Sequence, residues 1–106
     1  MKLENEKALI RTIAEGNTKS FEVLFYSYYP RLKGFICDLL QSPEEAEDIS
    51  QDIFTTLWQN RTSLDKIDNI SAYLFRIAKN AVYRHIERNM LFKNYQQKQI
   101  GRTSEL

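Results

Sequence analysis

The chain has 106 residues, of which 42% are hydrophobic and 12% aromatic, and its formal net charge is +1. This length provides for one hydrophobic core and excludes a separate catalytic domain beside it. The single cysteine, Cys37, excludes a disulfide framework, and with the single histidine, His85, it is too few ligands for a usual zinc site. The sequence shows neither a run of roughly 20 apolar residues nor an uncharged secretory start, so we expect a cytoplasmic protein.

The charges are distributed unevenly along the chain. Residues 71–106 contain seven basic and two acidic residues, whereas residues 1–70 contain eight basic and twelve acidic residues. One part of the molecule therefore suits an anionic partner and another part a cationic partner.

The spacing of apolar residues predicts an all-α fold, a compact bundle of about four helices. The first helix covers about residues 4–15 and ends at Gly16-Asn17, since both residues tolerate a left-handed conformation. Thr18 is expected to cap the second helix. That helix continues past Pro30, where we expect a kink, because the apolar spacing resumes beyond the proline.

The remaining elements follow from a start signal and a polar stretch. Ser42 can cap a third helix, and Glu45 can complete a capping box, so this helix runs from Pro43 to about residue 60. The polar residues 61–69 predict a loop of about nine residues, longer than usual between bundle helices. The fourth helix starts at residues 69–71 and ends near residues 90–92.

An acidic surface is predicted on the third helix. From Asp38 to Gln59 the chain contains six acidic residues and no lysine or arginine. Acidic residues in the first turn complement the helix dipole, but this effect fades beyond that turn and does not account for Asp48, Gln51 and Asp52. Solvated helices usually mix both signs of charge at i,i+4. We therefore predict a docking surface for a basic or polar partner, with a solvated acidic face as the alternative.

A basic stripe is predicted on the fourth helix. Its members recur at intervals of three or four residues and so share one side of the helix: Tyr73, Arg76, Asn80, Arg84 and Arg88. Phosphates attract the charges, and unpaired bases stack on aromatic rings. The stripe is consistent with nucleic-acid binding, and a solvated basic face remains the alternative.

The residues do not support an enzyme. His85 has no serine or cysteine partner at a plausible spacing, so we expect it to face phosphate or solvent. A glycine-rich phosphate loop is missing. A di-iron bundle needs Glu-x-x-His pairs on two helices, which one histidine cannot supply. We therefore expect no enzymatic activity, no metal and no cofactor.

Two segments carry a family resemblance. One is the acidic segment Glu45-Ala46-Glu47-Asp48-Ile49-Ser50-Gln51-Asp52-Ile53-Phe54, and the other is Tyr73-Leu74-Phe75-Arg76-Ile77-Ala78-Lys79-Asn80. They are similar to the patterns Asp-Ala-Glu-Asp-hydrophobic-x-Gln-Glu-x-Phe and Tyr/Trp-Leu-x-x-Ile-Ala-x-Asn. The chain thus resembles, over about residues 5–92, region 2 of the sigma-70 family of bacterial transcription initiation factors, in particular the extracytoplasmic-function (ECF) group.

The resemblance implies a domain that binds the β′ clamp coiled coil of core RNA polymerase and melts the minus-ten promoter element by capturing its non-template strand. The expected clamp-binding residues are Asp48, Gln51, Asp52, Thr55 and Gln59. Residues 61–71 would form a pocket for a flipped base, which can be filled only after unpairing. The expected DNA-binding residues are Arg61, Asn69, Ser71, Tyr73, Arg76, Lys79, Asn80, Arg84 and Arg88.

The resemblance also implies a domain organisation. Residues 1–92 would be region 2, and residues 93–106 the start of an interdomain linker or a disordered tail, with region 4 absent. Tyr73-Leu74 stands where primary sigma factors usually carry two tryptophans, so weaker unaided melting and more stringent promoter choice are expected. Asp52 replaces the commoner glutamate, which keeps the charge but shortens the reach. An anti-sigma factor, common in this group, is a candidate partner.

One alternative function belongs to a different class. The chain could be a helical protein–protein interaction module without a DNA-melting role, whose acidic face binds a partner and whose basic face is solvated. Preference for single-stranded over duplex DNA separates the two readings.

Overall fold

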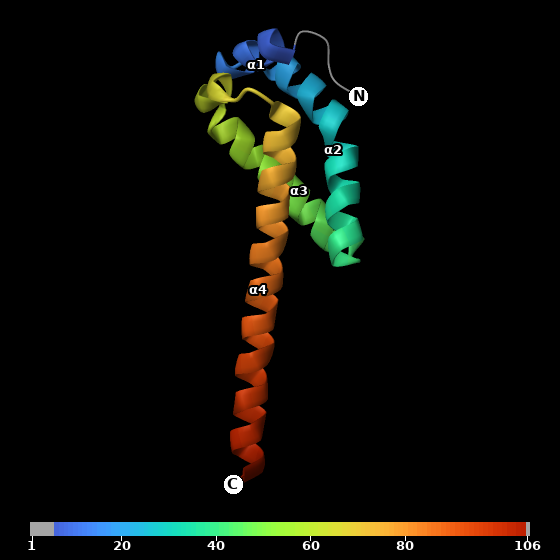
Figure 1. Cartoon of the computed structure of the whole chain (residues 1–106), viewed down its shortest axis with the longest axis vertical. Helices are drawn as coiled ribbons and strands as arrows, with labels where there is room; N and C mark the ends of the chain where they lie inside the picture. Colours follow the sequence, from blue (N-terminus) through green and yellow to red (C-terminus); the bar gives the residue numbers. More distant parts are fainter. Residues whose placement is uncertain (1–5, 106) are drawn as a thin grey trace.

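The computed structural model describes residues 6–105 and, within them, the side chains of residues 6–93. Four α-helices and one 3₁₀-helix make up this part of the chain: α1 (Glu6–Ala14), α2 (Thr18–Leu40), α3 (Pro43–Gln59), η1 (Arg61–Lys66) and α4 (Ile70–Glu105). Figure 1 shows α1, α2 and α3 gathered around the first part of α4, which then extends beyond them. The predicted all-α fold is confirmed.

The turn between α1 and α2 is a Schellman motif. Gly16 has φ of 97°, and its N–H donates to the carbonyl of Ile13 at 2.9 Å, while the N–H of Asn17 donates to the carbonyl of Thr12 at 3.0 Å. The predicted stop at Gly16-Asn17 is confirmed. The predicted cap is wrong by one residue, because the Asn17 side chain, not that of Thr18, accepts from the N–H of Ser20 at 3.0 Å.

Helix α2 continues through Pro30 without a break. Figure 1 shows its axis changing direction along its length. A proline inside a helix removes one hydrogen bond and its ring displaces the carbonyl one turn earlier, which accounts for a bend. The expected single, kinked helix is thus the one observed.

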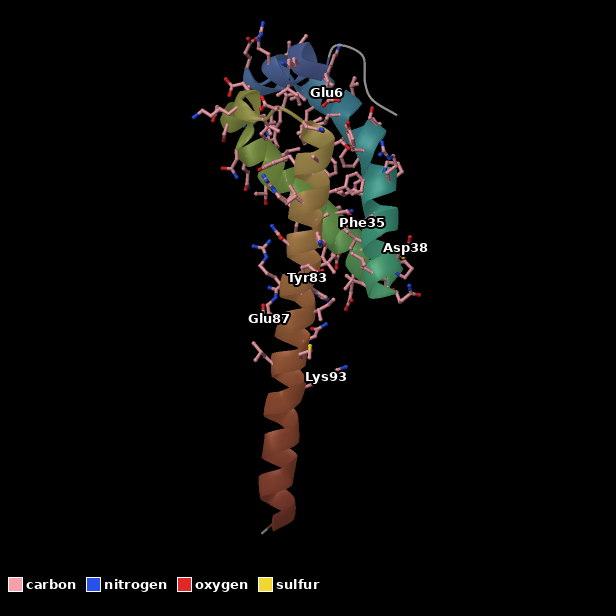
Figure 2. All side chains as sticks on the ribbon, viewed as in Figure 1. Glu6, Phe35, Asp38, Tyr83, Glu87 and Lys93 are labelled. Atoms are coloured by element: carbon pink, nitrogen blue, oxygen red, sulfur yellow. The ribbon has the colours of Figure 1, made fainter. Side chains whose placement is uncertain are left out.

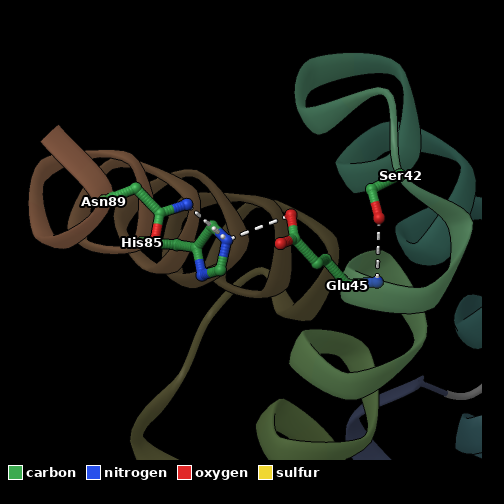
Figure 3. Close-up of polar contacts among 4 residues, drawn as sticks. All are labelled: Ser42, Glu45, His85 and Asn89. Carbon is green, nitrogen blue, oxygen red and sulfur yellow. Dashed lines mark hydrogen bonds and ion pairs between the residues drawn. The ribbon is translucent and has the colours of Figure 1, made fainter. Parts of the chain in front are cut away.

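The start of α3 follows the predicted capping signal only in part. Ser42 Oγ accepts from the N–H of Glu45 at 3.3 Å, and Pro43 occupies the first turn. The Glu45 carboxylate, however, lies 3.1 Å from His85 Nε2 on α4, and Asn89 Nδ2 lies 3.2 Å from the same nitrogen (Figure 3). The His85 side chain is therefore only 20% exposed and ties α4 to the start of α3. His85 is thus a partly exposed surface group, as one of the two expectations had it, and its ring contacts Glu45 and Asn89.

Residues 61–69 are more ordered than the predicted loop. Six of them form η1, which packs against α1. Leu64 is the buried residue of η1, at 2% exposed, and Ile70, the first residue of α4, is 1% exposed. One buried leucine in a polar sequence gives no α-helical pattern, which is why the sequence indicated a loop.

The core lies between the helices and draws on all five elements. Phe54 of α3 packs against the rings of Phe21, Phe25 and Tyr29 of α2, with centroid distances of 6.3, 5.1 and 6.0 Å. Figure 2 shows Phe35 of α2 beside α4, where it meets Phe75 edge to face at 5.4 Å. Edge-to-face pairs add about 0.5–1.5 kcal/mol beyond the area that they bury. Aromatic contacts therefore fix α2 against both α3 and α4.

Helix α4 is longer than predicted. It continues beyond residue 92 to Glu105, because the sequence after Lys93 contains no proline and reaches a glycine only at Gly101. A helix can run from a domain into a linker, so the domain boundary expected at residues 92–93 stays a prediction.

Replacing Leu64 by alanine should test whether η1 is a packed element. Its side chain is 2% exposed, so Leu64→Ala should lower the free energy of unfolding by about 2–5 kcal/mol in chemical denaturation. The exposed neighbour in η1 provides the control, and Thr62→Ala should change stability by no more than about 0.5 kcal/mol. Equal effects of the two substitutions would contradict the packing of η1.

Candidate functional site

The five residues predicted for clamp binding form one ridge on α3. All five are exposed, and at 100° per residue they lie within about 100° of the helix circumference. The buried face of α3, which includes Ile53, Phe54 and Leu57, lies on the opposite side. We call the ridge the acidic crest, and it consists of Asp48, Gln51, Asp52, Thr55 and Gln59.

The acidic charges of the crest are left unpaired within the domain. Among the side chains of residues 6–93, the one ion pair is His85–Glu45, and it includes neither Asp48 nor Asp52. Gln51 Nε2 lies 3.4 Å from the Glu47 carboxylate, which orients an amide on the crest. An exposed, one-signed surface of this kind complements a basic partner.

Four of the five residues predicted for the basic stripe lie together on one side of α4. Tyr73, Arg76, Asn80 and Arg84 lie within about 80° of the helix circumference, opposite the buried residues of α4. The Arg76 guanidinium lies 5.6 Å from the centroid of the Tyr73 ring. The half-buried Tyr73 ring therefore has a cation beside it. Proteins that bind single-stranded nucleic acids commonly combine an aromatic ring, on which a base stacks, with a cation near the phosphates.

Two further members of the predicted set flank this stripe. Arg88 lies one turn beyond Arg84, toward α3. Lys79 lies on the opposite flank, with its ammonium 5.8 Å from the centroid of the exposed Tyr83 ring. Figure 2 shows Tyr83 and Glu87 farther along α4. The exposed face of α4 over residues 70–93 is therefore mainly basic, with one acidic residue, Glu87, beyond Arg84.

The other three predicted DNA-binding residues make contacts within the domain. Arg61 Nη1 donates to the Trp58 carbonyl at 3.0 Å, and its guanidinium lies 4.4 Å from the centroid of the Trp58 ring. Asn69 Oδ1 accepts from the N–H of Ala72 at 3.1 Å and so caps α4. Ser71 faces α2, beside the Tyr28 hydroxyl. Their roles in DNA binding stay predictions, and the structure gives each a structural role.

Tyr28 has the one shifted pKa among the residues whose side chains are described. Burial raises the pKa of its hydroxyl above the usual value, and the carboxylate of Glu6 adds to the rise, while Arg31 and Ser71 oppose it. The hydroxyl donates to Glu6 Oε2 at 3.3 Å. Since the neutral phenol is the favoured form, Tyr28 serves as a buried anchor between α1 and α2.

A groove of about 830 Å³ separates the acidic crest from the basic stripe. Asp52 lies on its α3 side, and Tyr73, Arg84, Glu87 and Arg88 lie on its α4 side. The floor is apolar and includes Ile53, Ile77 and Ala81. One end is formed by residues around η1, namely Asn60, Ser63, Leu64, Lys66 and Ile67. We call it the α3–α4 groove. Ser63, Leu64, Lys66 and Ile67 fall within the range 61–71 expected to form a pocket, whereas Asn60 was not predicted.

A second, shallower groove of about 580 Å³ runs along the other side of the acidic crest, between α2 and α3. Its rim consists of Thr18 together with Gln51, Thr55 and Gln59 of the crest. Four rings line it, Phe21, Phe25, Phe54 and Trp58. We call it the aromatic groove. Phe21/Phe25 and Phe54/Trp58 are spaced by four, which in the sequence indicates core positions and not a groove.

Other kinds of site are not found in the described part of the chain. Among the side chains of residues 6–93, no group of three or more histidine, cysteine, aspartate or glutamate residues could hold a metal ion. Of the helices between residues 6 and 105, none has the length and hydropathy that crossing a membrane requires.

Comparisons of the sequence with known proteins identify its family. The family model of sigma-70 region 2 matches residues 24–91, which include the crest and the stripe. The ECF RNA polymerase sigma factor RpoE of Cereibacter sphaeroides is 31% identical over 75 residues, covering 69% of this chain and 41% of that protein. The RNA polymerase sigma-H factor of Pseudomonas aeruginosa is 23% identical over 83 residues, covering 78% and 43%.

The chain spans less than half the length of these two relatives. No solved structure matches it significantly. The match to the region 2 model covers more than half of the chain, and a relative above 30% identity bears the ECF name. The chain therefore belongs to the sigma-70 family, as region 2 of an ECF sigma factor.

Proposed function

We propose that this domain binds the β′ clamp of core RNA polymerase through α3 and recognises and melts the minus-ten promoter element through η1 and α4. The family is one of transcription initiation factors, so the domain acts by binding, not as an enzyme, and its place of action is the cytoplasm. The observation that carries the proposal is that an acidic crest and a basic stripe lie on opposite sides of one groove. Two partners of opposite charge can therefore bind side by side.

The charge pattern of the crest supports binding to a basic helix. Asp48 and Asp52 are one turn apart and exposed, and no described side chain pairs with either of them. Arginines on a partner helix can bind such carboxylates through two parallel hydrogen bonds. Gln51, Thr55 and Gln59 extend the crest with uncharged hydrogen-bonding groups.

The α4 side of the groove supports capture of a single strand. A base released from pairing could stack on Tyr73, which contributes about 1–3 kcal/mol per base. Asn60, Ser63 and Lys66 provide an amide, a hydroxyl and an ammonium group at the η1 end of the same groove. Because a stacked, flipped base is available only after unpairing, binding here would favour the melted promoter.

Reversing the charge of the crest should weaken polymerase binding. In a pull-down of core RNA polymerase, Asp48→Arg/Asp52→Arg should reduce capture at least tenfold, which corresponds to about 1.4 kcal/mol. Asp65→Arg/Asp68→Arg is the matched control, since it makes the same change of charge at two exposed acidic residues outside the crest. Undiminished capture by the crest variant would refute the docking role of α3.

Removing single groups from the stripe should weaken binding of the non-template strand. The chain in complex with core polymerase is titrated with a labelled strand selected from a random pool, at several salt concentrations. Arg76→Ala should reduce the slope of log K against log salt by about 0.7, the value for one phosphate contact to a single strand. Asn80→Ala should lower the affinity but keep the slope, because an amide neutralises no phosphate.

Lys19→Ala provides the control for this titration, because Lys19 is an exposed cation on α2, outside the stripe. It should change neither the affinity nor the slope. A wild-type complex with no preference for single strands over duplex would support the protein–protein interaction module instead.

Tyr73 should control promoter opening. Tyr73→Ala removes the stacking ring, so opening, followed by 2-aminopurine fluorescence in the minus-ten element, should fall at least tenfold. Tyr73→Trp enlarges the ring and should retain or increase opening. A Tyr73→Ala variant that opens the promoter as well as the wild type would contradict this role.

A further inference from the structure

We propose that the aromatic groove receives a large aliphatic side chain from the same polymerase helix that binds the acidic crest. This inference rests on the proposed function and adds the chemistry of the partner: a helix that carries basic residues for the crest and one leucine-, isoleucine- or methionine-like residue for the groove.

The crest and the aromatic groove share residues. Gln51, Thr55 and Gln59 belong to the exposed ridge of α3 and also form the α3 rim of the groove. Their spacing by four places them in one row along the helix. A helix that covers this row therefore also covers the groove beneath it, and the groove must be filled by a side chain or by water.

The lining of the groove selects an apolar guest. Phe54 is 2% exposed at the floor, while the half-buried Phe21 and Phe25 form the α2 side. The rim residues, Thr18 included, carry no charge. A cationic guest would find no carboxylate there, whereas a large aliphatic side chain would bury apolar surface against the rings, which favours binding. Basic groups of the partner can instead form ion pairs with Asp48 and Asp52 on the crest.

Trp58 also favours an aliphatic guest over a cation. The Arg61 guanidinium already lies 4.4 Å from the centroid of the indole ring, so a second cation over that ring would be repelled. Arg61 also donates to the Trp58 carbonyl and thereby holds the end of α3. This gives Arg61 a positioning role at the protein-binding surface.

The groove is formed before any partner binds. Phe21 packs against Phe54 and Trp58, with centroid distances of 6.3 and 5.1 Å, and Phe25 packs against Phe54 at 5.1 Å. Rings that are fixed by their neighbours lose little rotamer freedom on binding. Such packed, aromatic pockets near the centre of an interface are where binding energy is concentrated.

The test uses the single tryptophan of the chain. Labelling with 5-fluorotryptophan gives one ¹⁹F resonance, that of Trp58, and the probe is the isolated β′ clamp coiled-coil fragment. On saturation with this fragment the resonance should shift and lose most of its H₂O/D₂O isotope shift, because the indole becomes shielded from solvent. A bound complex in which the isotope shift is unchanged would overturn the inference.

A pair of variants at the α2 rim completes the test. Thr18→Phe places a ring at the rim, outside the α3 crest, and should weaken fragment binding about tenfold. Lys19→Phe is the matched control, because Lys19 is exposed on the same turn but does not line the groove, and it should bind like the wild type. Chemical denaturation of both variants is the control for folding, and each should unfold cooperatively.

The outcomes separate the groove from the crest. Full binding by Thr18→Phe, with binding lost in Asp48→Arg/Asp52→Arg, would overturn the role of the groove and leave the crest as the docking site. A wild-type domain that fails to bind both the fragment and core polymerase would overturn the proposed function, and the inference with it.

Discussion

The packing of Phe54 against three rings of α2 determines how α3 is rotated about its own axis. With Phe54, Ile53 and Leu57 facing inward, the residues half a turn away must face solvent. That rotation places Asp48, Asp52 and their neighbours on an exposed crest, and it opens one groove on each side of the crest. A helix rotated by one residue would bury an acidic residue and expose an aromatic ring, so the proposed docking surface depends on this contact.

The rotation of α4 about its own axis is likewise fixed by its buried face. Leu74, Ala78 and Val82 are fully buried, and the small alanine allows α4 to lie close to its neighbours. The stripe then points outward, and Tyr73 remains half-buried at the edge of the α3–α4 groove. Opposite charges on neighbouring helices would normally pair, yet the described side chains join α3 to α4 by one ion pair, His85–Glu45. The charged groups of the crest and the stripe therefore form no ion pair with one another.

The sequence predicted those parts of the molecule that depend on local pattern. The four helices, the stop at Gly16-Asn17 and the cap at Ser42 follow from spacing and from single residues. The exposed polar face of α3 follows from helical periodicity, whereas the choice of the five crest residues on it follows from the family resemblance. Element η1 was missed because its packing rests on Leu64, which contacts residues distant in sequence. The aromatic groove was missed for a related reason: its rings come from two helices, and no local pattern pairs them.

The position of Asp52 links the two proposed binding events. Asp52 lies on the crest and also borders the α3–α4 groove, opposite Arg84 and Arg88. In the free domain its charge opposes the approach of a phosphate backbone to that groove. A basic helix bound to the crest would compensate this charge and thereby raise the affinity of the groove for a strand. By linkage, the strand would raise the affinity of the crest for the basic helix by the same factor. If both proposed partners bind, the shared groove would couple them without a conformational change.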